Sequence, residues 1–454
     1  PPRSTLFPYT TLFRSFLRPS QTGLSDEQRS MMAVFDTFWE SLSTTEQNTV
    51  CQLSVFKGRF SDDAARGVAN ASSFFLEALV ARSFLRRTLR GRYELHELLR
   101  QYAAERLIEQ PWLLNAALDQ HRSFYLEFLQ RRKPLLAQDP KVIDEMEADL
   151  ENLRAALRRA IEQQHSPGFE ALLVFTSFCQ RTGNLHEGLS FVERAIQALR
   201  TNPQPSLFLG RALQQKASFL AWLNQNEEAI ACAREALQIA ADLGNLPLEA
   251  EARRSLGQIL FQTSDYAAAR AELENALFLA RQEDLPLLEA EILLNLGNVT
   301  LDLDVGRLEL AQDAYAQALA IFRRLNNLSR QCGALNNLGL VALYHDDYQI
   351  AQTYFEQNLL LARSINDRLS QGSALINLGT VAGFQRRFTA AKQYLLEART
   401  LLHTIGARQD EGIAIWTLGF VHLFSGDFGG AQLFLEQSLE LMREIGRASC
   451  RERV

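Results

Sequence analysis

Apolar residues recur at helical spacing along the C-terminal two-thirds of the chain. Segments such as EAEILLNLGNVTLDL (residues 289–303) and RLELAQDAYAQALAIFRRL (residues 307–325) carry them at i, i+3 and i+4, which is typical of amphipathic α-helices. Short polar turns such as YHDDY (344–348) and FSGDF (424–428) separate these segments. The pattern predicts helical hairpins joined by tight turns.

The hairpins repeat with a nearly constant period. The dipeptide Leu-Gly recurs with its glycines 40, 42, 40 and 40 residues apart. An alanine follows each glycine by 12 residues, or by 14 where LDLDVGRLEL carries a two-residue insertion, and a second short residue stands seven positions later. Small residues at these positions let two helices cross closely, so we predict seven stacked hairpins between about 169 and 445. The three sets are Gly257, Gly297, Gly339, Gly379 and Gly419; Ala269, Ala311, Ala351, Ala391 and Ala431; and Ala276, Ala318, Asn358, Ala398 and Ser438.

The pattern of Leu-Gly followed by Ala-x-x-x-aromatic, as in Ala351 to Phe355, resembles the tetratricopeptide repeat. That repeat usually spans about 34 residues, whereas HEAT and armadillo units span about 40 to 47, so length alone favours the latter. The glycine and alanine positions favour the tetratricopeptide repeat, with the extra residues between hairpins, as in LARSINDRLSQGSALINLG (361–379). The resemblance implies an all-α fold, a tetratricopeptide-type α-solenoid at residues 167–446, of the long variety found in bacterial signalling ATPases.

A different pattern precedes the repeats. It predicts a helix that ends near Lys57-Gly58, a second helix after Ser61, a third over FFLEALVARS (74–83), and two short strands around the turn at residues 89–91. This order of elements predicts a small winged-helix domain at residues 28–110. A helical linker at residues 111–166 follows it.

Two segments of this domain carry a second resemblance. LSVFKGRF (53–60) and LHELLRQYA (95–103) closely resemble the winged-helix module that follows the nucleotide-binding domain in STAND-type (NB-ARC) ATPases, including antibiotic-regulator-like proteins. In that family the histidine of a Met-His-Asp motif contacts the β-phosphate of bound ADP. Leu95-His96-Glu97 occupies the matching place, with Leu for Met and Glu for Asp, so the resemblance implies that His96 senses nucleotide in the intact protein. A packed, hydrogen-bonded histidine is the alternative.

The chain lacks the motifs of a catalytic site. It contains no G-x-x-x-x-G-K-[ST] phosphate-binding loop, no G-x-S-x-G and no H-E-x-x-H, so we expect no enzyme activity, no catalytic residue and no cofactor. The five cysteines form no C-x-x-C pair, which favours neither a zinc site nor disulfides and fits a reducing cytoplasm. The net charge is −6 and no apolar run reaches about 18 residues, so no membrane partner is expected.

Two functions remain. The first is a protein-interaction and regulatory module, in which the solenoid binds a protein or peptide and the winged helix relays this to the nucleotide-binding domain of the same full-length protein. The alternative is a transcriptional regulator that binds DNA directly. Residues 31–110 contain ten Lys or Arg and ten Asp or Glu, whereas DNA-binding domains are usually basic, so DNA is not the expected partner. The arginines that would contact DNA are Arg82, Arg86, Arg87, Arg90 and Arg92.

The resemblance to tetratricopeptide repeats also implies a binding groove. In such solenoids the first helix of each hairpin lines the concave face, and the residue two before the glycine points into the groove. Three of these residues are asparagines in successive repeats, suited to holding the main chain of an extended peptide, while Trp416 and Tyr344 would supply side-chain pockets. Asparagines that merely fit the repeat are the alternative, and Phe384 and Phe424 are expected to pack between hairpins. The five groove positions are Ser255, Asn295, Asn337, Asn377 and Thr417.

Both ends of the chain depart from their neighbours. PPRSTLFPYTTLFRS (1–15) and GRASCRERV (446–454) resemble translated sequencing-adapter read-through. We therefore expect residues 1–27 to be a non-native or disordered segment and residues 447–454 to be an artefactual tail.

Overall fold

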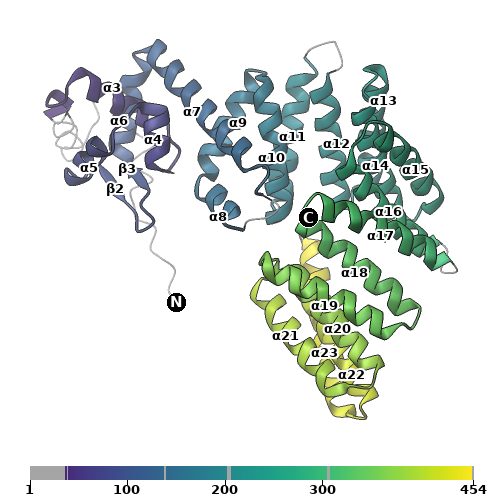
Figure 1. The fold of residues 1–454 in the computed structure, drawn as a ribbon. Helices are drawn as coiled ribbons and strands as arrows, with labels where there is room; N and C mark the ends of the chain where they lie inside the picture. The colour runs from purple at the N-terminus through teal and green to yellow at the C-terminus, as the bar shows by residue number, and fades with distance from the viewer. Residues whose placement is uncertain (1–35, 38, 137–139, 202–205, 304–306, 452–454) are drawn as a thin grey trace. The chain divides into compact units, whose positions relative to one another are not determined.

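The computed structural model describes residues 36–37, 39–136, 140–201, 206–303 and 307–451, and the rest of both terminal segments lies outside these ranges (Figure 1). The chain forms two compact units. Unit 1 comprises residues Pro1–Tyr125 and Ala148–Ala156, and unit 2 comprises Leu126–Glu147 and Leu157–Val454. The expected helical linker at 111–166 is helical in its described part, and its helices are divided between the two units.

Unit 1 combines short helices with a small sheet. Serine side chains begin its first helices, because Ser43, Ser61 and Ser72 each accept a hydrogen bond from a backbone N–H three residues later. The sheet has the strand order β1-β3-β2 and is antiparallel. Its elements are α3 (Thr44–Leu53), β1 (Arg59–Phe60), α4 (Asp62–Ala69), α5 (Ser73–Ala81), β2 (Leu85–Arg87), β3 (Tyr93–Leu95) and α6 (Glu97–Ile108). Three further helices follow: α7 (Pro111–Arg132), α8 (Pro140–Ala148) and α9 (Leu150–Glu162). Helices α7 and α9 continue into unit 2, and α8 lies mainly in unit 2.

The β2–β3 hairpin forms where the sequence predicts two strands. Leu85 pairs with Leu95 and Arg87 with Tyr93, across the turn at residues 89–91. Leu85, Tyr93 and Leu95 are buried, so one face of the hairpin covers the core of unit 1 while the other carries arginines.

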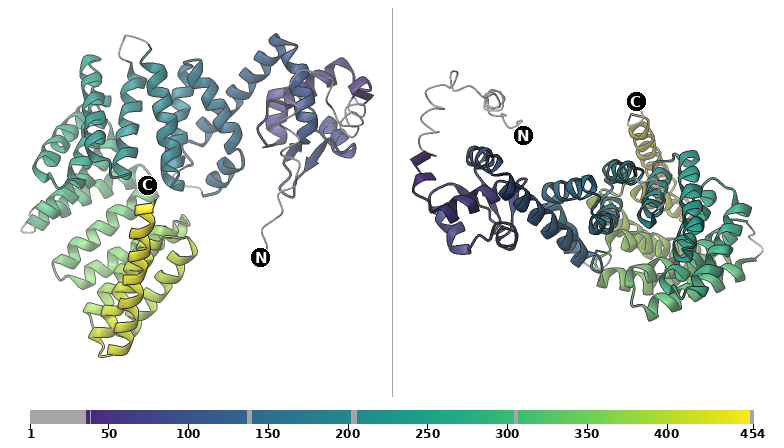
Figure 2. Two further views of the ribbon diagram at one scale, coloured as in Figure 1. Left: turned by 180° about the vertical axis from the view of Figure 1, so that it is seen from behind. Right: turned by 90° about the horizontal axis from the view of Figure 1, so that it is seen from above.

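Unit 2 is built from seven helical hairpins in the described part of the chain, as predicted, and Figures 1 and 2 show them stacked in sequence order. The first helices of successive hairpins contact one another directly, so they form an inner layer, with the second helices outside. The pairs are α10 (Ser166–Thr182) with α11 (Leu185–Leu199), α12 (Leu207–Trp222) with α13 (Asn226–Asp242), α14 (Leu246–Gln262) with α15 (Tyr266–Gln282), α16 (Pro286–Leu303) with α17 (Leu308–Arg324), α18 (Leu328–Tyr344) with α19 (Tyr348–Ser364), α20 (Arg368–Phe384) with α21 (Phe388–Thr404), and α22 (Arg408–Phe424) with α23 (Phe428–Arg451).

Within each of the five clearest hairpins, the glycine of the first helix lies against one large side chain of the second. A Cβ atom on any of these glycines would overlap that side chain. The partner follows the glycine by 16 residues in four hairpins and by 18 in the hairpin with the two-residue insertion, so the insertion leaves the contact in place. The contacts join Gly257 to Leu273, Gly297 to Tyr315, Gly339 to Phe355, Gly379 to Leu395 and Gly419 to Leu435.

The two other sets of small residues are buried where the helices cross, as predicted. The five repeat alanines, Ala269 to Ala431, are between 0% and 3% exposed. At the later position Asn358 and Ser438 replace alanine and are also buried. The Ser438 hydroxyl donates to the Gly412 carbonyl at 3.0 Å, whereas the buried Asn358 Oδ1 accepts no hydrogen bond from any residue in the described part of the chain. Steric fit therefore decides these positions more than side-chain chemistry does.

Two glycines of α18 offer a matched test of this packing. We expect Gly339→Ala to lower the free energy of unfolding by about 1–3 kcal/mol, because the added methyl group would overlap the buried ring of Phe355. Gly333→Ala should instead raise it by about 0.5–1 kcal/mol, since a Cβ there meets open space and alanine favours the helix. Urea denaturation followed by circular dichroism measures both, and a shift of the same sign in the two variants would contradict the packing argument.

Candidate functional site

His96 lies at the N-terminus of α6 in unit 1. It is the residue before the first turn of the helix, and its side chain is exposed and makes no capping hydrogen bond. The alternative of a packed histidine is therefore wrong, because the strand ends at Leu95 and turns the next side chain outward. Glu97 is bound by Arg100 at 2.6 Å and by Gln101 at 2.9 Å; these contacts, led by Arg100, lower the pKa of its carboxyl group.

The five arginines considered for DNA binding differ in their surroundings. Arg87 forms an ion pair with Glu77 at 2.8 Å, and Arg92 forms one with the buried Asp149. The other three, Arg82, Arg86 and Arg90, are exposed. Two of the five charges are thus neutralised within unit 1, which weakens the DNA alternative.

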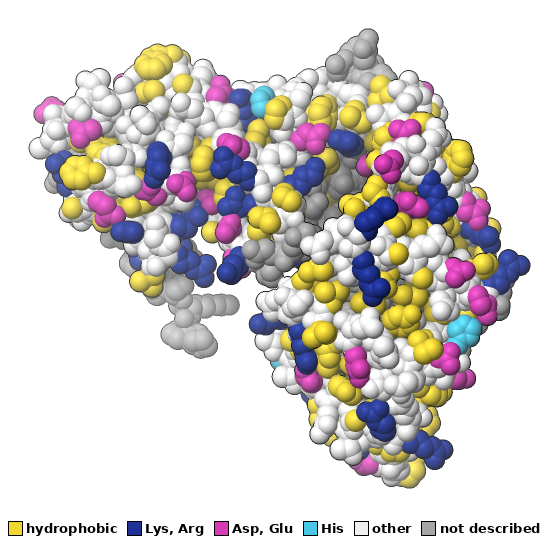
Figure 3. All heavy atoms as spheres, in the orientation of Figure 1, with side chains coloured by type: hydrophobic (Ala, Val, Ile, Leu, Met, Phe, Trp, Pro, Cys, Tyr) yellow, Lys and Arg dark blue, Asp and Glu magenta, His cyan; other side chains and the backbone are white. Residues whose placement is uncertain are grey.

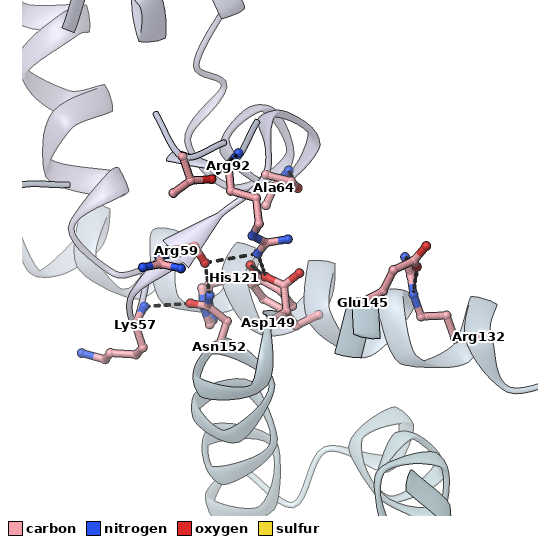
Figure 4. Close-up of polar contacts among 12 residues, drawn as sticks. Lys57, Arg59, Ala64, Arg92, His121, Arg132, Glu145, Asp149 and Asn152 are labelled. Carbon is pink, nitrogen blue, oxygen red and sulfur yellow. Dashed lines mark hydrogen bonds and ion pairs between the residues drawn. The ribbon is translucent and has the colours of Figure 1, made fainter. Parts of the chain in front are cut away.

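A buried polar network joins the hairpin to α7 and to the start of α9 within unit 1. Figure 4 shows Arg92 directed toward Asp149, and Lys57 and His121 converging on Asn152. Asn152 Oδ1 accepts the Lys57 backbone N–H at 2.7 Å and lies 3.2 Å from His121 Nε2, while its Nδ2 donates to the Arg59 carbonyl at 2.9 Å. One asparagine therefore pairs with two backbone groups that lie more than 90 residues away in the sequence and with a histidine 31 residues away.

Burial sets the protonation of this network. His121 is 3% exposed, and burial lowers the pKa of its imidazole to about 4, with the charge of Lys57 acting in the same direction. Burial and the neighbouring Asp149 raise the pKa of the Tyr125 hydroxyl well above its ordinary value, and that hydroxyl donates to Asp149 at 3.0 Å. In the same network Asp149 forms an ion pair with Arg92.

The inner face of unit 2 carries a chain of amides. Asn337 Nδ2 donates to Asn298 Oδ1 at 3.1 Å, and Asn377 Nδ2 donates to Asn336 Oδ1 at 2.8 Å, so asparagines of α16, α18 and α20 link successive first helices. We call Asn298, Asn336, Asn337 and Asn377 the amide chain. Its two links are joined by a long contact of 3.5 Å between Asn336 and Asn337. Asn298 and Asn336 were not predicted from the sequence.

The predicted groove residues fall into three environments. Asn337 and Asn377 belong to the amide chain and are half-buried, as is Asn295, which lies apart from the chain. Ser255 and Thr417 are buried. The residues two positions before the repeat glycines are thus more buried than the sequence analysis predicts. They lie on the same helical turn as the largely buried leucine and glycine of the Leu-Gly dipeptide.

Exposed aromatic side chains surround a hollow of about 450 Å³ between α20 and α22. Trp416, Phe420 and Phe424 lie at successive i, i+4 positions of α22, with ring centroids 4.5 Å and 6.3 Å apart. We call this site the aromatic hollow. Its main lining residues are Phe384, Arg386, Phe388, Trp416, Phe420 and Phe424.

The aromatic hollow corrects one expectation. Phe384 and Phe424 are 58% and 70% exposed and are therefore not buried between hairpins. The Phe384 ring does stack on Tyr348 of α19 in the preceding hairpin, with ring centroids 5.7 Å apart. Each is the last residue of its first helix, beyond the crossing point at the glycine, and stays mostly exposed there. Tyr344 stands at the equivalent end of α18 and is 61% exposed. Phe420 and Arg386 were missed, although Phe420 directly follows the repeat glycine.

Polar side chains line the inner face in the preceding hairpins. A hollow of about 250 Å³ contains Asn295, Trp222, Arg254, Glu291 and Arg330 among its lining residues, and we call it the polar hollow. Glu291 binds Arg330 at 2.6 Å and lies 3.8 Å from Arg254. The inner face is therefore charged in its earlier hairpins and aromatic in its last ones. Figure 3 shows hydrophobic side chains exposed on the C-terminal hairpins, on the face turned to the viewer.

Sequence comparison identifies the repeats. A model of the tetratricopeptide repeat matches residues 208–282 and 330–403, which span α12–α15 and α18–α21. Unit 2 has the tetratricopeptide-repeat fold. No curated protein matches the chain.

Three solved structures have a similar fold. A Signal Transduction ATPase with Numerous Domains (STAND) protein with a tetratricopeptide repeat sensor, from Pyrococcus horikoshii, is 14% identical, with 95% of this chain and 67% of that chain covered and a TM-score of 0.50. A Rap protein complexed with competence and sporulation factor is 16% identical, with 77% and 93% covered and a TM-score of 0.55. A Rap conjugation gene regulator in complex with the Phr* peptide is 14% identical, with 73% and 96% covered and a TM-score of 0.50. At these identities the likeness is one of fold.

The cysteines are placed as structural residues. Within the described residues, Cys51, Cys179, Cys232 and Cys332 are buried and form no disulfide bond. Burial raises the pKa of Cys51 to about 11 and that of Cys332 to about 12, which makes these two thiols poor nucleophiles. Within the described residues no cluster of His, Cys, Asp and Glu could hold a metal ion. None of the described helices is both long enough and apolar enough to cross a membrane.

The buried imidazole of His121 should make unit 1 sensitive to acid. Below about pH 6.5 the unfolded chain binds a proton at this residue, while the folded protein does not bind it until about pH 4, so stability falls as pH drops through this window, by up to about 3 kcal/mol. We expect His121→Gln to flatten the pH dependence of urea denaturation between pH 6.5 and 4. The exposed His186 provides the control, since His186→Gln should leave the curve unchanged. Parallel curves for wild type and His121→Gln would contradict the assignment.

Proposed function

We propose that this chain is a protein-interaction and regulatory module that binds an extended peptide segment of a partner on the inner face of unit 2. The observation that carries the proposal is the amide chain beside the aromatic hollow. Monomeric proteins rarely leave several large aromatic side chains exposed around one hollow, and such clusters mark binding sites.

The amide chain retains groups for a peptide main chain. Within the described residues no hydrogen bond uses Asn377 Oδ1, and none uses the side chain of Asn295. Asn337 Nδ2 and Asn377 Nδ2 each donate one bond, and an amide nitrogen can donate two. Amides one repeat apart could therefore pair with the N–H and C=O groups of an extended chain, as we inferred for Asn295, Asn337 and Asn377.

The likeness of fold supports a peptide ligand. One of the similar structures is a Rap regulator in complex with the Phr* peptide, and another is a STAND protein with a tetratricopeptide repeat sensor. We extend both descriptions to this chain as a proposal. Unit 2 is the sensor, and partner binding is its input.

We further propose that unit 1 is a winged-helix relay to the nucleotide-binding domain of a longer protein. The sheet order, the position of α5 and the β2–β3 hairpin support a winged helix. The exposed His96 stands at the N-terminus of α6, where backbone N–H groups and the helix dipole favour an anion such as a phosphate. Both features are compatible with the ADP contact that the resemblance to STAND ATPases implies.

Selection from a random peptide library tests the proposed ligand. The purified chain should enrich a peptide motif, and Trp416→Ala should weaken binding of the enriched peptide at least about tenfold, because exposed tryptophans in hollows are typical binding hot spots. The triple variant Asn295→Ala, Asn337→Ala and Asn377→Ala should weaken it further. Phe278→Ala is the matched control, since Phe278 is also an exposed aromatic residue, 69% against 52% for Trp416, but lies on a second helix, α15. Failure to enrich any peptide, or equal loss in Phe278→Ala, would refute the proposal.

The role of His96 is testable in a full-length protein that contains the nucleotide-binding domain. We expect His96→Ala to speed the release of bound ADP and to raise basal activity, because an imidazole at the phosphate stabilises the resting state. His186→Ala, at another exposed histidine, should change neither. An unchanged rate of ADP release in His96→Ala, measured by stopped-flow with a fluorescent ADP analogue, would remove His96 from the nucleotide site.

A further inference from the structure

The charge that lines the aromatic hollow is positive. Its lining includes no acidic side chain, and Arg386 is its one cationic residue. Arg386 is exposed, and no hydrogen bond or ion pair within the described residues engages its guanidinium group. The hollow therefore combines an apolar wall with a positive charge that has no counter-ion.

The other polar side chains that line the hollow already donate hydrogen bonds within the protein. The Thr380 hydroxyl donates to the Ile376 carbonyl at 3.0 Å, and the Thr417 hydroxyl donates to the Ile413 carbonyl at 2.9 Å. Both bonds lie within the helices that carry the threonines. A bound group therefore finds Arg386 as the side chain with free donors.

The backbone conformation of Arg386 also indicates a role for its side chain in binding. Arg386 follows the C-cap of α20 and has a φ of 58°, in the left-handed region. This region favours glycine, asparagine and aspartate, and an ordinary side chain there costs free energy. The equivalent turn residues of four other hairpins are Asn224, Ser264, Asp346 and Gly426. An arginine at this position is thus unfavourable for the turn, which indicates that its side chain serves another purpose.

We propose that the aromatic hollow binds an acidic peptide segment in which a large apolar residue is adjacent to Asp or Glu. This inference rests on the proposed function and names the chemistry of its ligand. The apolar side chain fills the space beside Trp416 and Phe424, and the neighbouring carboxylate accepts charge-assisted hydrogen bonds from Arg386. Aromatic clusters also attract cations, but Arg386 repels a cation and the hollow offers no carboxylate to bind one.

The test uses a random heptapeptide library displayed on phage and the full chain. The wild-type chain should enrich Phe, Trp or Leu next to Asp or Glu. Arg386→Asn should lower the affinity for the best enriched peptide about tenfold and abolish the acidic preference in a repeated selection, while the apolar preference remains. The same substitution should raise the melting temperature, because asparagine suits the left-handed turn. A structural role for Arg386 predicts the opposite shift.

Arg368→Asn is the matched control. Arg368 is exposed at the opposite end of α20, about 25 Å along the helix, and its replacement should change the affinity by less than twofold. Retention of the acidic preference in Arg386→Asn, or enrichment of Lys or Arg beside the apolar residue, would overturn this inference and leave the proposed function intact. Enrichment of no peptide by the wild-type chain would refute the proposed function and this inference with it.

Discussion

The contact between each first-helix glycine and one large side chain of the second helix is the constraint on which unit 2 depends. It fixes how closely and at what rotation the two helices of a hairpin meet, because only a residue without a Cβ admits the ring of Tyr315 or Phe355. The two-residue insertion before α17 illustrates its importance. The contact of Gly297 with Tyr315 is preserved in spite of the two extra residues.

The same constraint determines which side chains lie on the inner face, where we propose that the partner binds. With the glycine turned toward the second helix, the positions three before, one after and five after it turn toward the inner face. In α14 these positions hold Arg254, Gln258 and Gln262, which line the polar hollow. In α22 they hold Trp416, Phe420 and Phe424, which line the aromatic hollow. The same helical register therefore places polar residues on the inner face of one hairpin and aromatic residues on that of another.

The repeats could be predicted from the sequence because their contacts are local and recur with a fixed period. The site was predicted only in part. Aromatic residues are usually buried, so the exposure of Phe384 and Phe424 depends on knowing where each first helix ends. The conformation of Arg386 and the convergence of Lys57 and His121 on Asn152 involve turn geometry and long sequence separations, which no short pattern encodes.

The two units are stabilised by different kinds of contact. Unit 2 relies on contacts between neighbouring helices, so its stability is spread along the array and a peptide that spans several first helices stabilises each hairpin it touches. Unit 1 adds to its apolar core a buried polar network in which Asp149 and Asn152 serve several partners at once. Loss of one partner leaves buried polar groups unsatisfied and costs more than the single bond. A perturbation of unit 1 therefore acts on the whole polar network at once, whereas a perturbation of unit 2 acts first on the hairpins that neighbour it.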